Sequence, residues 1–412
     1  MPKRLLSLNN YHYRRGGADM VFLEHDAMFR NLGWETAVFA MQHPKNIPSP
    51  WEIYFADELE LGGNYGLLKK LSMASKVIYS REARKKLEGL LEKFRPDIAH
   101  AHNIYHHLSP SILSLLHERG IPTVMTAHDL KLACPAYKML NREGICERCK
   151  HGNVLHLVRH RCIHNSLPIS GLIAVESLAH RAFGLYRKNL DKIITPSQFF
   201  RTKLIEWGWA PEKLVHIPNY VHVSDYTPQF QPGRHYLYFG RLAPEKGVDT
   251  LILACARINA KLCIVGSGPY EATLRKLAEP FTGNIEFLGY RAGEELKSLV
   301  GAARAIILPS QWYENAPMSI LEAYAIGKIV IAANIGGIPE MILDGETGFL
   351  FKSGNVEELA ECLAQVSSLP DETIAQMGVR ARDYVSQTFP VGRYVEEMLN
   401  LYHSLGAGMA LA

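Results

Sequence analysis

Two glutamates, Glu314 and Glu322, stand eight positions apart where an apolar strand gives way to a helix. The apolar run 305–308 stops at Pro309. Pro317 is expected at the first position of a helix whose apolar residues have helical spacing, and Gly327 is expected to end that helix. The free N–H groups and dipole of a helix that follows a parallel strand favour phosphate. Carboxylates beside such a helix are suited to accept hydrogen bonds from sugar hydroxyls. The stretch therefore predicts a nucleotide-sugar site, whose other expected binding residues are Asn315, Ala316, Met318 and Ser319.

Two cations follow the first apolar strand of the second half of the chain. Arg241 ends that strand, and Lys246 lies where the next helix opens. A planar guanidinium fork and an ammonium point charge both suit a diphosphate leaving group. Taken alone, each residue type is more often an ordinary surface cation. Their place after a strand, like that of Glu314, favours a shared site.

The first half of the chain offers a histidine and two glycines after strands. His128 follows the strand TVMTA, where its imidazole could exchange a hydrogen bond with a substrate hydroxyl. Gly16 and Gly17 occupy a strand-to-helix turn and would let the backbone approach a phosphate closely. An ordinary turn is the alternative interpretation of the glycines.

Four of the seven cysteines fall within a stretch of 29 residues, with a C-x2-C pair at its centre. The spacing predicts a tetrahedral thiolate site, with structural zinc first and an iron–sulfur cluster second. Disulfides or free thiols remain alternatives, the former disfavoured in a reducing compartment. The insertion, residues 130–165, begins just after His128, so we hypothesise that it shapes acceptor recognition. The expected ligands are Cys134, Cys146, Cys149 and Cys162, and His151, His160 or His164 could replace one of them.

Strands and helices alternate along the chain in two series, separated by a polar, proline-bearing segment at 222–235. Such alternation predicts parallel sheets built from right-handed βαβ units. We therefore predict an α/β fold of two Rossmann-like, doubly wound domains that face a cleft. Their expected ranges are 1–225, with the cysteine-rich insertion, and 226–388, and a last helix within 389–412 is expected to cross back onto the first domain. A long helical stretch is expected over 65–94.

Charge is distributed unevenly between the two halves. Residues 1–225 hold 30 Lys and Arg against 21 Asp and Glu, whereas residues 226–412 hold 15 against 20. The basic segment 69–86 could meet an anionic membrane surface or a phosphorylated acceptor, or could simply be a solvated helix face. No stretch reaches the roughly 18 to 20 apolar residues of a membrane span, and the N-terminus is expected to form a strand rather than a signal peptide. We expect a cytoplasmic protein, with peripheral membrane contact possible through the basic first domain.

A series of motifs along the chain resembles the retaining glycosyltransferases of family 4, which share the GT-B fold of two Rossmann-like domains. The resemblance covers nearly the whole sequence, and the motifs occur in the order of that family. Tyr220 stands where the family usually has a glycine after I-P-N. The motifs are GGAD (16–19), TAHD (126–129), TPS (195–197), IPN (217–219), GRLAPEKGVD (240–249), VGSGP (265–269), ENAPMSILEAYAIGKIVIA (314–332), GGIPE (336–340) and GETGFLF (345–351).

The resemblance implies a role for each matching residue. Gly16 would approach the donor phosphate, and His128 would contact the donor sugar near the reacting carbon. Arg241 and Lys246 would stabilise the departing diphosphate. Glu314 would hold the sugar hydroxyls, and Glu322 would hold the ribose.

These expectations together indicate transfer of a hexose, with retention, from a nucleotide sugar to a glycan or lipid-linked acceptor in surface polysaccharide assembly. A UDP-sugar is the expected donor on family frequency. We expect no catalytic divalent cation, because no Asp-x-Asp segment follows a strand. A nucleotide-sugar epimerase or hydrolase on the same fold is the alternative, and it would need no acceptor. A metal-containing nucleic-acid-binding protein is a third hypothesis, disfavoured because acids intersperse the basic residues.

Overall fold

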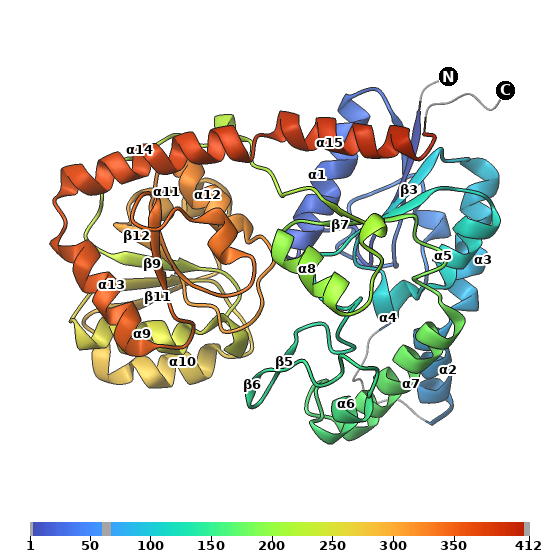
Figure 1. The fold of residues 1–412 in the computed structure, drawn as a ribbon, viewed down its shortest axis with the longest axis horizontal. Coiled ribbons are helices and arrows are strands. Elements are labelled where there is room, and N and C mark those ends of the chain that lie inside the picture. The colour runs from blue at the N-terminus through green and yellow to red at the C-terminus, as the bar shows by residue number, and fades with distance from the viewer. Residues whose placement is uncertain (1–2, 60–66, 408–412) are drawn as a thin grey trace. The chain divides into compact units, whose positions relative to one another are not determined.

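The computed structural model describes residues 3–59 and 67–407, which form two compact units (Figure 1). The first unit comprises Met1–Arg142, Cys146–Ile217 and Glu396–Ala412, and the second comprises Glu143–Ile145 and Pro218–Val395. The division at Ile217 lies before the predicted domain boundary at residue 225. The last helix, α15 (Val391–Ser404), enters the first unit from Glu396 onward.

The first unit is built on a parallel sheet of six strands in the order β2-β1-β3-β4-β7-β8. Apolar side chains such as Leu5, Leu6 and Ile193 are buried, as expected for a sheet covered on both faces. The strands are β1 (Arg4–Leu8), β2 (Glu35–Phe39), β3 (Ile98–Ala101), β4 (Thr123–Thr126), β7 (Lys192–Thr195) and β8 (Leu214–His216). The helices between them are α1 (Gly17–Asn31), α2 (Leu67–Ile78), α3 (Arg81–Lys93), α4 (Tyr105–Leu108), α5 (Ser111–Glu118), α6 (Leu155–Arg159), α7 (Leu167–Phe183) and α8 (Gln198–Glu206).

The second unit contains another parallel sheet of six strands, in the order β11-β10-β9-β12-β13-β14. Neighbouring residues of β12 face opposite sides, so Ile307 joins one apolar cluster and Ile306 joins the other. The strands are β9 (Tyr236–Phe239), β10 (Leu262–Val265), β11 (Ile285–Gly289), β12 (Ala305–Leu308), β13 (Val330–Ala333) and β14 (Gly348–Phe351). The helices are α9 (Val248–Arg257), α10 (Glu271–Ala278), α11 (Gly293–Gly301), α12 (Met318–Ile326), α13 (Val356–Ser368) and α14 (Asp371–Thr388).

Two parallel, Rossmann-like sheets confirm the predicted fold class. The 65–94 stretch, however, is two helices, because Ser80 interrupts it and its hydroxyl accepts the Ala83 N–H as the N-cap of α3. Residues 65 and 66 lie outside the described ranges. In the part of the chain that is described, no helix is both long and apolar enough to span a bilayer. A two-stranded sheet of β5 (Leu140–Asn141) and β6 (Gly144–Ile145) lies in the cysteine-rich segment 130–165. Short 3-10 helices cover Glu52–Tyr54, Pro211–Lys213, Val223–Asp225, Pro244–Lys246, Glu279–Phe281 and Ile338–Met341.

Candidate functional site

The loops that follow β9, β12 and β13 pack against one another at the same edge of the second sheet. Gly247 has a φ of +64°, and a Cβ there would lie 2.0 Å from the carbonyl oxygen of Pro309. Gly336 also has a φ of +64°, and a Cβ there would lie 2.4 Å from the carbonyl oxygen of Glu314. The Gly337 N–H donates to that oxygen at 2.9 Å. These close approaches require glycine and fix the loop that carries Glu314 against its neighbours.

Lys246 and Glu314, predicted as separate contacts, form an ion pair. Lys246 Nζ lies 2.7 Å from Glu314 Oε1, and the Ser310 hydroxyl donates to the same oxygen at 2.7 Å. Burial alone would raise the pKa of Glu314, which is 7% exposed, but the Lys246 charge and these hydrogen bonds lower it overall. Glu314 is therefore held ionised in a fixed orientation. The Lys246 ammonium lies over the Trp312 ring, 5.1 Å from its centroid.

Helix α12 begins beside this pair and runs to Gly327, the predicted end, whose φ of +85° is left-handed. Pro317, expected as the first helical residue, is instead the N-cap, because its ψ of +122° is extended, and no side chain caps the N-terminus. Ala316 is buried, and its carbonyl oxygen accepts a hydrogen bond from Asn219 Nδ2 at 2.8 Å. Arg241 is exposed on the loop that also carries Lys246. Half-buried positions around this N-terminus are Asn315, Met318, Ser319 and Glu322.

His128, in the first unit, contacts a second histidine that sequence reasoning missed. The rings of His102 and His128 are stacked, and His102 Nδ1 lies 2.8 Å from His128 Nε2. The two meet because β3 and β4 are neighbouring strands and each histidine follows one of them. Burial lowers the pKa of His128 to about 4, so the ring is neutral at pH 7. The sequence signal for His102 was available, since it ends the apolar strand DIAHAH.

Gly16 and Gly17 are exposed at the start of α1. Gly16 has an extended φ of −170°, and a Cβ there would meet no atom within 4 Å. The chain itself therefore gives no steric reason for glycine at this position. Asp19, from the same motif, has a structural contact, because Asn9 Nδ2 donates to its carboxylate at 2.9 Å.

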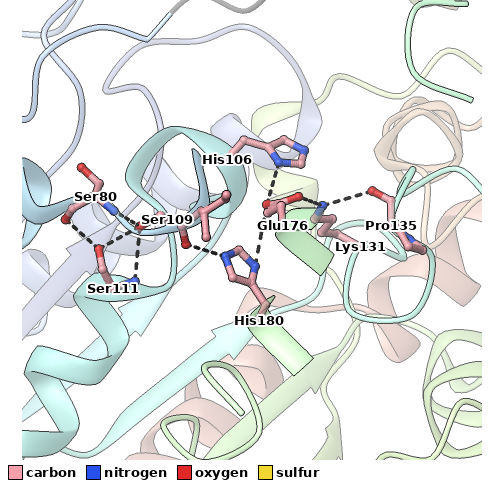
Figure 2. Close-up of polar contacts among 9 residues, drawn as sticks. Ser80, His106, Ser109, Ser111, Lys131, Pro135, Glu176 and His180 are labelled. Atoms are coloured by element: carbon pink, nitrogen blue, oxygen red, sulfur yellow. Dashed lines mark hydrogen bonds and ion pairs between the residues drawn. The ribbon is translucent and has the colours of Figure 1, made fainter. Parts of the chain in front are cut away.

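A buried carboxylate, Glu176 on α7, organises the residues that follow His128 (Figure 2). Lys131 Nζ donates to Glu176 Oε2 at 2.9 Å and to the Pro135 carbonyl oxygen at 3.1 Å, and His106 Nδ1 lies 2.8 Å from Glu176 Oε1. Burial alone would raise the pKa of Glu176, but Lys131 and His106 hold it at about 2. Burial and the Lys131 ammonium lower the pKa of His106, so its neutral ring donates to the carboxylate. His180 lies beside the pair, and its Nε2 is 2.7 Å from the Ile78 carbonyl oxygen.

We expect Glu176→Ala to destabilise the first unit strongly. The substitution leaves the buried Lys131 ammonium without its carboxylate, which costs about 3–5 kcal/mol and should lower Tm by on the order of 10 °C. Thermal unfolding followed by circular dichroism measures the change. The matched control is Glu92→Ala, since Glu92 is exposed on α3 of the same unit. Equal melting temperatures for Glu176→Ala and the control would show that the buried pair contributes little.

The four clustered cysteines line one small cavity of about 10 Å³ within the segment 130–165. Cys134, Cys146, Cys149 and Cys162 are all free thiols, and His156 lines the same cavity. The three histidines considered as substitute ligands do not line it. Among the described residues, no group of three or more His, Cys, Asp or Glu side chains is arranged to hold a metal ion. The zinc site therefore stays a prediction.

Comparison with known proteins covers both units. The family model described as "Glycosyltransferase Family 4" matches residues 15–225, and "Glycosyl transferases group 1" matches residues 228–384. A GDP-mannose-dependent monoacylated alpha-(1-6)-phosphatidylinositol monomannoside mannosyltransferase of Corynebacterium glutamicum is 32% identical over 214 residues, 46% of this chain and 56% of that protein. The matched segment thus spans little more than half the length of this relative.

Solved structures share the fold across both units. A sucrose-phosphate synthase from Thermosynechococcus elongatus superposes with a TM-score of 0.73 at 20% identity, covering 98% of this chain and 99% of its own. Anabaena Alr3699/HepE in complex with UDP superposes with a TM-score of 0.68 at 20% identity. The match covers 98% of this chain and 100% of the Anabaena chain. At this identity the likeness establishes the GT-B fold alone. With one family model covering half the sequence and a second covering the second unit, the chain belongs to glycosyltransferase family 4, among the group 1 glycosyltransferases.

Proposed function

We propose that this protein is a retaining glycosyltransferase that moves a hexose from a nucleotide sugar to a glycan or lipid-linked acceptor. The observation that carries the proposal is the Lys246–Glu314 ion pair beside the N-terminus of α12. It puts a cation and an oriented carboxylate next to free helix N–H groups, which are the partners that a sugar diphosphate needs. Surface polysaccharide assembly is the process in which we expect such a transfer.

The nucleotide base of the donor is the least constrained part of the proposal. The Corynebacterium relative is named as GDP-mannose-dependent, whereas the Anabaena neighbour was solved with UDP. We take a UDP-sugar as the first donor to test. Glu322, half-buried on α12, is the residue proposed to hold the ribose hydroxyls.

The proposed reaction breaks the bond between the anomeric carbon and the diphosphate oxygen and forms a bond from the acceptor oxygen on the same face. The departing phosphate takes the proton of the acceptor hydroxyl, so no carboxylate nucleophile is required. Lys246 and Arg241 stabilise the charge that develops on the diphosphate, and Glu314 holds the sugar hydroxyls. His128 contacts the sugar as a neutral imidazole.

A panel of UDP-, GDP- and ADP-sugars tests the proposal. The purified protein is incubated with each donor in the presence of EDTA, and released nucleotide and thermal stabilisation are read together. One donor should release nucleotide and raise Tm, and release should increase when a suitable acceptor is added. A folded protein that neither binds nor cleaves any donor would contradict the proposal. Activity that returns only with added Mg²⁺ would contradict the metal-independent mechanism.

We also propose that the four cysteines bind one structural zinc ion. Closed four-cysteine sites stabilise small loops by coordination, and the cavity in the insertion gathers the required thiols. Elemental analysis of the full chain should find about one zinc per molecule. Cys149→Ser should lose the zinc, whereas Cys362→Ser, a cysteine of the second unit, should keep it. Iron with visible absorbance would favour a cluster instead, and the absence of both metals would refute the site.

A further inference from the structure

Helix α7 presents apolar side chains to solvent along one face. Leu167, Val175, Leu178 and Phe183 have exposed fractions between 50% and 67%. Positions 171, 175, 178 and 182 repeat at helical spacing and carry Gly, Val, Leu and Ala. A contiguous apolar helix face in water indicates contact with another surface.

The neighbouring helix α6 extends this apolar face. Leu155, its first residue, is 73% exposed, and α6 packs against α7. Both helices lie in the first unit, as Figure 1 shows. We refer to Leu155, Leu167, Val175, Leu178 and Phe183, together with the exposed cations Arg159, Arg161, Arg181 and Lys188, as the α6–α7 face.

The charge of this part of the chain is almost entirely positive. Residues 148–188 contain seven Lys and Arg and a single acidic residue, Glu176, a net charge of +6. Glu176 is fully buried and paired with Lys131, so it offsets no exposed cation (Figure 2). Of the seven cations, Lys150 is paired with Glu206 of α8. Apolar side chains bordered by exposed cations form the surface that an anionic bilayer attracts and partly inserts.

A cavity of about 190 Å³ adjoins α7, and, like the α6–α7 face, it is lined by cationic side chains. Lys131, Lys150, Arg181 and Arg187 line it, together with Trp207. Lys131 is paired with Glu176 and Lys150 with Glu206, so Arg181 and Arg187 supply the rest of the positive charge. Cations and an indole are groups that lie favourably at a lipid headgroup layer. The cavity therefore extends the positive surface inward from the apolar helix face.

We propose that the α6–α7 face docks onto a membrane surface that contains anionic phospholipids. The inference goes beyond the transfer reaction and does not depend on it. It also moves the expected membrane contact away from segment 69–86. In that segment Lys76 lies near Asp57 and Glu82, and Arg84 pairs with Glu118, so part of its positive charge is compensated.

Two other possible partners fit the α6–α7 face less well than a membrane does. A second copy of the chain would bring together two α6–α7 faces, each with four exposed cations, and their repulsion opposes association. A nucleic acid would pair with the cations but would leave the apolar side chains against a polar backbone. An anionic bilayer satisfies the charges and the apolar residues together.

Co-sedimentation of the full chain with vesicles tests the proposal. Vesicles of phosphatidylcholine with about 30% phosphatidylglycerol should bind about tenfold more protein than pure phosphatidylcholine, and salt should weaken the binding. Leu178→Glu with Phe183→Glu should lower the partition about tenfold or more, because apolar insertion is lost. Arg159→Glu with Arg161→Glu should lower it about fivefold for each cation removed.

Matched controls exclude general effects of added charge. Ile53→Glu places a glutamate at a side chain that is 72% exposed elsewhere in the same unit and should leave binding unchanged. Lys85→Glu with Lys86→Glu removes cations of segment 69–86 and should also have little effect. Melting temperatures confirm that each variant folds. Equal binding to both vesicle types, or wild-type binding by folded Leu178→Glu/Phe183→Glu, would overturn the proposal. So would a dimer in light scattering that this double variant dissociates.

Discussion

Replacing Lys246 with alanine should lower kcat/KM for glycosyl transfer by about a thousandfold. Lys246 is the cation that directly contacts Glu314, at 2.7 Å, beside the N-terminus of α12. Its loss removes the charge proposed to stabilise the leaving diphosphate and releases the carboxylate proposed to hold the sugar. Nucleotide release and product formation, each over a range of donor concentrations, measure the effect. A fully active Lys246→Ala enzyme would refute the assignment.

Loss of activity must be separated from loss of folding, because Lys246→Ala leaves the buried Glu314 uncompensated. The double variant Lys246→Ala/Glu314→Gln removes both charges and should recover most of the melting temperature that the single variant loses. It should nevertheless remain inactive. Lys297→Ala, in the same unit and paired with an exposed glutamate on α11, is the matched control and should keep full activity.

The first unit should lose stability steeply as the pH falls below about 6.5. His25, His100 and His102 are fully buried. Burial lowers the pKa of His25 to about 3 and lowers the pKa values of His100 and His102 well below the ordinary value. The Tyr402 hydroxyl of α15 joins two of them, lying 2.8 Å from His25 Nε2 and 2.6 Å from His100 Nδ1, and the His102 ring stacks on that of His100.

The direction of this pH dependence follows from the number of protons that each state binds. Below about pH 6.5 the unfolded chain protonates these histidines, whereas the folded chain keeps them neutral until the pH approaches their lowered pKa values. The unfolded state therefore binds more protons, and the free energy of unfolding decreases as pH falls. Each histidine contributes a loss of about 2 kcal/mol by pH 5, which is large against a total stability of about 5–15 kcal/mol.

Urea unfolding followed by tryptophan fluorescence between pH 7.5 and 4.5 measures this dependence for the first unit. Trp312 is the one tryptophan of the second unit, so replacing it with phenylalanine leaves fluorescence that reports on the first unit. His25→Gln should flatten the pH dependence, and His117→Gln, a change at an exposed helix end, should not. A stability of the first unit that stays constant from pH 7 to pH 5 would contradict the expectation.

Local sequence signals predicted most of the fold. The strand 305–308 and the glycine at the end of α12 appear in the structure where periodicity and backbone preferences indicated them, whereas Pro317 is the N-cap of α12 and not its first helical residue. The division of residues 65–94 was missed, since both parts have helical spacing and only Ser80 marks the break. The fold class followed from the alternation of elements, which two series of short buried strands make unusually clear.

The site was harder to predict, because its contacts join residues from different strands. The Lys246–Glu314 pair depends on β9 lying beside β12, and the His102–His128 contact depends on β3 lying beside β4. The order of the strands along the sequence does not reveal which strands are adjacent in the sheet. Glu176 carried a signal, a single charge in an apolar helix, but its partners Lys131 and His106 come from separate segments. The role of Gly16 stays a prediction, since a Cβ at this position would meet no described atom within 4 Å and sterics do not explain the glycine.

Calorimetric titration of nucleoside diphosphates against their nucleosides tests the central claim most directly. UDP, GDP and ADP are titrated into the folded protein in parallel with uridine, guanosine and adenosine. If phosphate binds at the N-terminus of α12 beside Lys246, one diphosphate should bind about a hundredfold more tightly than its own nucleoside. Nucleosides that bind as tightly as their diphosphates, or no binding of any diphosphate, would contradict the proposed donor site.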